Sequence, residues 1–284
     1  MDIRRNQRNL TAQQKQELIQ AILTLKNDVP STLRPGQQNR YDDFVEVHRN
    51  VMGGADAIVP PPHLSPLFYP WHRVFLREFE LALQNATGNW SLTLPYWDWN
   101  GGADTPLTAD FLGEDGNPQN NNRVETGPFA LSHNQFEIRV WNTNEGDRGL
   151  RRNFAHAGEL PSVSDTNTAL EKTPYWSGDD NAWESFSERT LHNAVHAWVG
   201  GNMLEPGSPN DPVFFLHHCN LDRLWERWKR QHPGQPHYLP ARGAPGYDLS
   251  SKLSFQALDR PAPWPRIFTI RQVLDTQALG YMYT

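Results

Sequence analysis

The sequence predicts a mainly α fold, a four-helix bundle with long irregular loops and a few short strands. Two observations lead to this prediction. Apolar residues recur at helical spacing in five segments of the chain. Between these segments the 284 residues include 23 prolines and several stretches rich in Gly, Asn and Asp, which favour irregular connections. Because no linker, repeat or low-complexity run divides the sequence, we expect a single domain over residues 1–284.

The bulk composition excludes several classes of protein. The formal net charge is −6 and the charges are scattered, which gives no electrostatic basis for binding nucleic acid or an anionic membrane. A membrane span needs a run of about 18 apolar residues, and none is present. Residues 1–8 lack the apolar stretch of a signal peptide, so a cytoplasmic protein is expected. Cys219 is the single cysteine, which rules out a disulfide within the chain.

Each predicted helix combines apolar spacing with signals for its start or end. The five segments are residues 11–26, 41–52, 71–84, 183–199 and 211–230. Thr11 and Asp211 have short acceptor side chains that can cap a helix, and Pro212 suits a first turn. Gly200 and Gly201 are a natural end for the fourth helix.

The remaining segments are expected to be loops or short strands. Residues 59–70 hold five prolines, each of which removes a backbone donor, so this stretch should be a stiff loop that presents His63. Extended segments are predicted at 92–99, 124–129, 136–141 and 268–274, and surface loops at 103–122 and 142–149.

Six of the 11 histidines fall into two sets. They are His48, His63 and His72 in the first half of the chain, and His192, His196 and His218 in the second. Each set takes at least two members from predicted helices, and facing helices of a bundle can house a dinuclear metal centre. Ligand sets made only of imidazole suit Zn, Cu, Fe or Ni, whereas Mg and Ca need oxygen ligands.

Other interpretations of these histidines stay open at this point. A histidine on an apolar helix face is often a core residue with a hydrogen-bond partner, or a ligand of one structural metal ion. The second set also fits a hydrolytic zinc site, but His192-Asn-Ala-Val-His196 lacks the glutamate that acts as general base in an HExxH helix. The five other histidines are assigned to surface or supporting positions, and among them His217 is expected to support a metal ligand.

Five stretches of the sequence resemble the copper-binding signatures of the tyrosinase family. They lie at residues 41–49, 62–63, 68–73, 191–201 and 210–225, and they contain all six histidines of the two sets. The opening Ile3-Arg-Arg-Asn-Gln7 and the closing Tyr281-Met-Tyr283 are also similar to the short bacterial tyrosinases. The resemblance therefore covers essentially the whole chain.

The resemblance implies two copper ions per chain, with O2 as co-substrate. By position, one copper would be held by His48, His63 and His72 and the other by His192, His196 and His218, while His217 would not be a ligand. Phe214, one helical turn before His218, matches the aromatic residue that packs over the site in this family.

Further positions implied by the resemblance concern the proton and the substrate. Asn193 and Glu184, with Glu188 as the alternative glutamate, resemble the pair that holds a water to take the phenol proton. Ala197 occupies the variable place after the second ligand that tunes activity. The remaining implied positions are Asp222, which supports the site from the last helix, and Pro206, which lines the mouth of the site within the loop 202–209.

Two departures from the family pattern lead to further expectations. No cysteine lies near His63 in the sequence, so we expect no thioether between a cysteine and a copper ligand. The sequence has no C-terminal lid domain, so the site should be open unless a separate copper-loading partner protein covers it.

The predicted function is oxidation of small phenols by O2. It comprises o-hydroxylation of monophenols and oxidation of o-diphenols to o-quinones. The alternatives are an o-aminophenol oxidase, a catechol oxidase with little activity on monophenols, and, with less support, a haemocyanin-like oxygen carrier.

Overall fold

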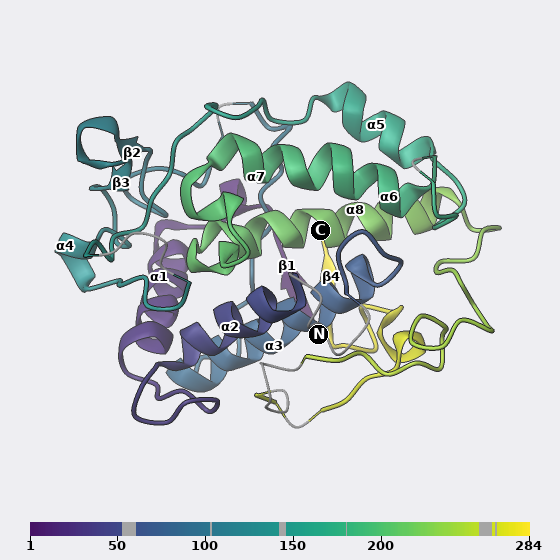
Figure 1. The fold of residues 1–284 in the computed structure, drawn as a ribbon, viewed down its shortest axis with the longest axis horizontal. Helices are drawn as coiled ribbons and strands as arrows, with labels where there is room; N and C mark the ends of the chain where they lie inside the picture. Colours follow the sequence, from purple (N-terminus) through teal and green to yellow (C-terminus); the bar gives the residue numbers. More distant parts are fainter. Residues whose placement is uncertain (53–60, 103, 142–145, 180, 256–262, 265) are drawn as a thin grey trace.

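The computed structural model describes residues 1–284 except 53–60, 103, 142–145, 180, 256–262 and 265. Helices form its centre, as predicted. Helix α2 (Arg40–Met52) lies beside α3 (Phe68–Thr87), and α3 also packs against α1 (Ala12–Asn27) and α8 (Val213–Gln231). A compound helix made of α6 (Trp183–Ser187), η3 (Glu188–His192) and α7 (Asn193–Val199) runs along α8 on the other side (Figure 1). The helices α2, α3 and α8 and the compound helix form the bundle.

Helix α1 begins where its capping signal predicts. The Thr11 hydroxyl accepts a hydrogen bond from the Gln14 N–H at 3.2 Å, and the Gln14 side chain accepts one from the Thr11 N–H at 3.0 Å. This capping box satisfies two donors that the first helical turn leaves unpaired. Leu18, Ile22 and Leu25 form the buried face of the helix, which confirms the predicted apolar spacing.

Helix α3 begins at Phe68, three residues before the predicted start at Trp71. Pro70 therefore lies inside the first turn, where its missing N–H needs no partner. His72 consequently lies one turn into the helix, where its Nδ1 is 2.8 Å from the carbonyl oxygen of Phe68. The helix ends at Gly88, whose φ of 68° is in the left-handed region that favours glycine.

The predicted helix over 183–199 is present but not uniform. Its middle, η3, is a π-helical turn in which the Asn193 N–H donates to the Glu188 carbonyl. Such wide turns are rare and often occur at functional sites. The helix ends at Gly200, as predicted, and the chain then passes so close to Arg151 that a Cβ on Gly201 would lie 2.1 Å from the Arg151 carbonyl oxygen.

Helix α8 begins at Val213, two residues after the predicted start at Asp211. One carboxylate oxygen of Asp211 accepts a hydrogen bond from the Val213 N–H at 3.0 Å, just after Pro212. Trp225 and Trp228 are buried along this helix. The other connecting helices and turns are α4 (Leu131–Asn134), α5 (Val163–Glu171), η1 (Gln7–Asn9), η2 (Pro118–Asn120), η4 (Gly201–Leu204), η5 (Ser208–Asn210) and η6 (Ile270–Val273).

The described strands are short and mostly not where the alternation predicts them. Strand β1 (Asp2–Arg4) pairs in parallel with β4 (Tyr281–Tyr283), and β2 (Gly116–Asn117) pairs antiparallel with β3 (Arg123–Val124). The predicted strand at 124–129 is thus wrong beyond Val124, and the one at 136–141 is wrong as well. The alternation in 136–141 is real, since Phe136, Ile138 and Val140 are buried, but within the described part of the chain no strand pairs with this segment.

Several irregular segments contribute to the core. Residues 92–99 pack in the core, as predicted, although among them only Tyr96 forms a β-bridge, with Asn6. The Trp97 N–H donates to the Leu216 carbonyl of α8 at 3.0 Å. Residues 104–122 are not the pure surface loop that their composition predicts, because Phe111 and Leu112 are fully buried. In the segment 268–274, the predicted strand and turn is mainly the turn η6.

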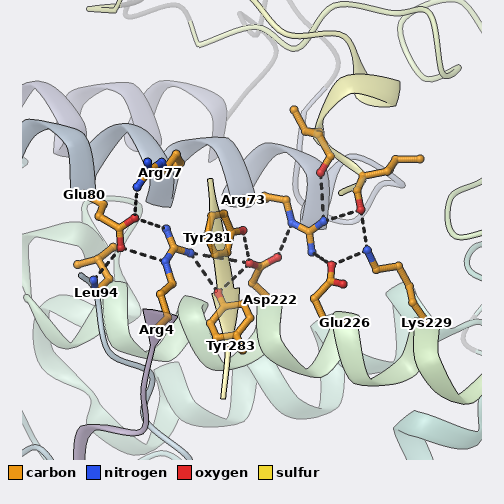
Figure 2. Close-up of polar contacts among 12 residues, drawn as sticks. Arg4, Arg73, Arg77, Glu80, Leu94, Asp222, Glu226, Lys229, Tyr281 and Tyr283 are labelled. Carbon is orange, nitrogen blue, oxygen red and sulfur yellow. Dashed lines mark hydrogen bonds and ion pairs between the residues drawn. The ribbon is translucent and has the colours of Figure 1, made fainter. Parts of the chain in front are cut away.

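A buried ionic network joins the chain ends to the bundle (Figure 2). Arg4 of β1 contacts Glu80 of α3 at 3.0 Å, and Arg73 of α3 contacts Asp222 of α8 at 2.7 Å. Tyr281 and Tyr283 of β4 each donate a hydroxyl to the Asp222 carboxylate, at 2.6 and 2.7 Å. Burial alone would raise the pKa of Asp222, but Arg73 and Arg4 hold that pKa below its usual value. Asp222 is therefore a buried anion that ties α3, α8 and the terminal strand together.

Candidate metal centre

Seven histidines from distant parts of the chain meet inside the bundle. The first group consists of His48 on α2, His63 on the irregular segment before α3, and His72 on α3; the second consists of His192 on η3, His196 on α7, and His217 and His218 on α8. Within each group the nitrogen atoms able to bind a metal lie within 4.8 Å of one another. Both sets predicted from the sequence are thus brought together, and His217 joins the second.

The two groups face each other. The rings of His72 and His218 are stacked with centroids 4.3 Å apart and an angle of 15° between their planes. The rings of His63 and His192 lie 6.0 Å apart. The ligand groups thus form one cluster between α2 and α3 on one side and α8 and the compound helix on the other.

Four of the histidines are oriented by a hydrogen bond at Nδ1. The acceptors are the carbonyl of Pro206 for His48 (2.9 Å), the carbonyl of Phe68 for His72 (2.8 Å), the side-chain oxygen of Asn193 for His192 (2.8 Å) and the carbonyl of Met203 for His196 (2.6 Å). Nδ1 must then carry the proton, which leaves the Nε2 lone pair available. All four Nε2 atoms are buried without a hydrogen-bond partner in the part of the chain that the structure describes.

This arrangement fits metal binding. An unsatisfied buried nitrogen costs about 1–3 kcal/mol, and each group holds two of these four atoms. A metal ion bound to each group would supply the missing partner, with the Nδ1 hydrogen bonds orienting the ligands.

Burial keeps the imidazoles neutral. Loss of solvation lowers the pKa of His48 to about 3 and that of His196 to about 4. Burial and the neighbouring imidazoles lower the pKa values of the other members of both groups well below 6.5. Neutral imidazole is the form that binds metals, so the site is ready for ligation at neutral pH.

His217 lies closer to the ligands than its predicted supporting role requires. Its ring stacks on His192 with centroids 5.4 Å apart and is 5.2 Å from the ring of Trp99. Within the described residues neither of its ring nitrogens has a hydrogen-bond partner, and the same holds for His218. The second group therefore has four candidate ligands where the sequence analysis has three.

Phe214 lies between the two groups. Its ring is fully buried, 4.1 Å from that of His218 and 4.9 Å from that of His48. This side chain keeps an apolar surface against both groups.

The residues predicted to handle the proton lie in two places. Asn193 is exposed, and its side-chain oxygen is the acceptor for His192. Glu184 and Glu188 are buried next to each other, and burial raises the pKa of Glu188 to about 7 and that of Glu184 well above its usual value. The Glu188 carboxylate accepts a hydrogen bond from the Leu64 N–H, at 3.0 and 2.8 Å from its two oxygens.

The other predicted positions surround the cluster. Ala197 is half-buried directly after His196, and Asp222 lies one turn beyond His218 in the ionic network. Pro206 contributes its backbone carbonyl to His48, a role that sequence analysis missed, as it missed the carbonyls of Phe68 and Met203. Every residue has such a carbonyl, so no sequence signal could have identified these three.

Comparison with known proteins agrees with this geometry. Residues 38–231 match the model of the common central domain of tyrosinase. The chain is 41% identical over 280 residues to a tyrosinase of Streptomyces glaucescens, covering 93% of each protein. It is 35% identical over 282 residues to a grixazone synthase of Streptomyces griseus, covering 84% of this chain and 87% of that one.

The fold is also found in solved structures. A variant of polyphenol oxidase from Thermothelomyces thermophila superposes with a TM-score of 0.74 at 24% identity, covering 100% of this chain and 89% of that one. Among the described residues, no helix is long and apolar enough to cross a membrane. The chain matches this family over most of its length and holds two facing histidine groups. It therefore belongs to the tyrosinase family.

Proposed function

We propose that this protein is a copper-dependent phenol oxidase that hydroxylates monophenols in the ortho position and oxidises o-diphenols to o-quinones. The observation that carries this proposal is the pair of facing, neutral histidine groups with unsatisfied Nε2 atoms in a chain similar to tyrosinases over most of its length. Copper bound there supplies the redox chemistry by which O2 oxidises the phenol ring.

The proposed ligands are three histidines for each of two copper ions. His48, His63 and His72 would hold one ion, and His192, His196 and His218 the other. Both groups, as the structure describes them, are made only of imidazole. Neutral ligands leave the charge of the ions uncompensated, which favours a phenolate or catecholate as the incoming group. Phe214 adds an apolar wall beside the ligands that suits an aromatic ring.

The phenol must lose its proton on the hydroxylating path. We propose that Asn193 and Glu184 hold the water that receives it. The Asn193 oxygen is used by His192, so its amide N–H groups are the ones that can face this water. Among the described residues neither carboxylate oxygen of Glu184 has a hydrogen-bond partner, so both can accept a hydrogen bond from ordered water. Burial raises the pKa of Glu184 and so makes its ionised form a stronger base.

Substitution of Asn193 tests this role. In Asn193→Ala we expect hydroxylation of a monophenol to fall by about 10²-fold, the lower end of a general-base contribution, and oxidation of a catechol to fall much less. The measurement is the ratio of the two kcat/KM values. Equal losses on both substrates would rule out the proton role.

The function as a whole is tested by loading the purified chain with copper. We expect two ions per chain, a strong near-ultraviolet band on addition of hydrogen peroxide, and bleaching of that band by catechol. One metal ion, or two without such a band, would contradict the proposal, and a band that persists with catechol would indicate an oxygen carrier. Uptake of two ions from a simple copper salt would also show that no copper-loading partner protein is required.

Oxidation of o-aminophenols is the second candidate function. It would use the same histidine groups, and the 35% identity to a grixazone synthase is consistent with it. We propose that Ala197 and Pro206 border the entrance and set the preference between substrates. Comparing kcat/KM for an o-aminophenol and for the matching catechol distinguishes the two functions.

A further inference from the structure

His63 differs from the other proposed ligands in how it is held. Five of the six lie on α2, α3, η3, α7 or α8, whereas His63 lies on the irregular segment that precedes α3. Within the described chain neither ring nitrogen of His63 has a hydrogen-bond partner. Its orientation must therefore depend on the backbone around it.

The backbone next to His63 is in an unfavourable conformation. Leu64 has a φ of 53°, in the left-handed region that a residue with a Cβ rarely adopts. Its side chain is 65% exposed, so packing of that side chain does not hold the turn. The Leu64 N–H, by contrast, donates to the buried carboxylate of Glu188 at 2.8 and 3.0 Å. This hydrogen bond is charge-assisted and belongs to the stronger class of such bonds.

Glu188 is placed to connect the two histidine groups. It is the first residue of η3, the turn that ends at His192. The same turn therefore carries a ligand of the second group and, through Leu64, supports a ligand of the first. The rings of His63 and His192 lie 6.0 Å apart across this connection.

Glu184 is buried beside Glu188, one helical turn earlier in the chain. Burial raises the pKa of both carboxyls, and the neighbouring carboxylate raises that of Glu184 further. The Leu64 N–H lies within hydrogen-bond distance of both Glu188 oxygens, so Glu188 is the carboxyl that contacts the backbone beside His63.

We propose that Glu188 is a positioning residue that holds His63 in place by binding the N–H of the left-handed Leu64. The proposal rests on the proposed function, because it takes His63 to be a copper ligand. Removing a group that orients a metal ligand typically costs about 10- to 100-fold in metal affinity. We expect that loss for the ion of the first group alone.

The main variant is Glu188→Met, which keeps the volume of the side chain without an acceptor. Replacing a buried charge by an apolar side chain of similar size is often tolerated by the fold. Glu188→Gln is the rescue variant, since its amide oxygen can still accept the Leu64 N–H. Glu78→Met is the matched control, because Glu78 is also a buried glutamate with a raised pKa but lies on α3 rather than on η3.

The readout is the copper content of each protein after dialysis against increasing concentrations of a chelator. Wild type and Glu78→Met should retain two ions, Glu188→Met should lose one ion at about 10- to 100-fold lower chelator concentration, and Glu188→Gln should fall between them. The double variant Glu188→Met with His63→Ala should hold one ion as tightly as His63→Ala alone, since both changes affect the same ion.

Three results would overturn the proposal. One is retention of both ions by Glu188→Met with wild-type affinity, and another is loss of both ions by the double variant. The third is a metal-free Glu188→Met protein that unfolds or is much less stable than Glu78→Met, because Glu188 would then support the fold as a whole. If wild type itself takes up fewer than two ions, the proposed function fails, which separates the two failures.

Discussion

The two histidine groups reach similar geometry in different ways. In the second group all four histidines lie on helical turns, and His192 and His196, four residues apart on the compound helix, have a ring separation of 4.3 Å. In the first group, His48 depends on the Pro206 carbonyl from another part of the chain, and His63 lies outside any helix. Local spacing therefore largely specifies the second group, whereas the first depends on contacts between segments far apart in the sequence.

The largest expected effect distinguishes His218 from His217. His218→Asn should lose one copper ion and reduce catechol oxidation by roughly 10³-fold or more, because a bound ion contributes several kcal/mol of charge stabilisation. His217→Asn should keep both ions and most of the activity. Copper content and kcat of the two variants are the measurements. If His217→Asn loses an ion and His218→Asn does not, the ligand assignment within the second group has to be exchanged.

The second largest expected effect is on folding stability, through the buried ion pair between Arg73 of α3 and Asp222 of α8. Asp222→Ala should destabilise the metal-free protein by about 3–5 kcal/mol, because it leaves Arg73 buried without one of its charge partners. Denaturant unfolding measures this change. Asp110→Ala, which removes an exposed ion pair with Lys15, is the control and should change stability by less than about 1 kcal/mol. A small effect of Asp222→Ala would mean that the two groups are not tied together by this network.

The smallest expected effect is on the pH dependence of stability. Burial raises the folded-state pKa of Glu188 from 4.5 to about 7, so the pair stabilises the fold at low pH and loses that contribution as pH rises through about 7. In Glu184→Gln the side-chain amide can donate to Glu188 without a proton being retained, so the loss of folding stability with rising pH should be smaller. As pH rises from 4.5 to 7, we expect the free energy of unfolding of the metal-free variant to increase by up to about 3 kcal/mol relative to that of wild type.

The histidines themselves act in the opposite direction on this pH profile. Their folded-state pKa values are lowered by burial, so their neutral forms stabilise the fold above pH 6.5 and this contribution is lost on acidification. The test for Glu184→Gln is therefore the difference between the two unfolding profiles over that range. Parallel profiles would show that the two carboxyls do not share a proton.

Much of the helical framework could be predicted because its signals are local. Thr11 caps α1 as expected, and the apolar spacing of α1 and α8 matches their buried faces. The cap residue of α8 is Pro212, and the Asp211 carboxylate before it accepts the Val213 N–H. Helix α3 begins three residues earlier than predicted. Pro70 can occupy a first helical turn, so the helix extends back from Trp71 to Phe68. The strands were missed because alternation indicates one buried face, whereas a strand also needs a partner from elsewhere in the chain.

Residue type and helical spacing, which are local properties, were enough to identify the six histidines and to place most of them on helices. The roles expected for Phe214 and Asn193 came from the resemblance to the tyrosinase family. The orientation of the rings, the entry of His217 into the second group and the contact of Glu188 with Leu64 follow from tertiary contacts. Some of these contacts use backbone carbonyls and N–H groups from segments more than 100 residues apart, and such groups cannot be told apart in a sequence because every residue carries them.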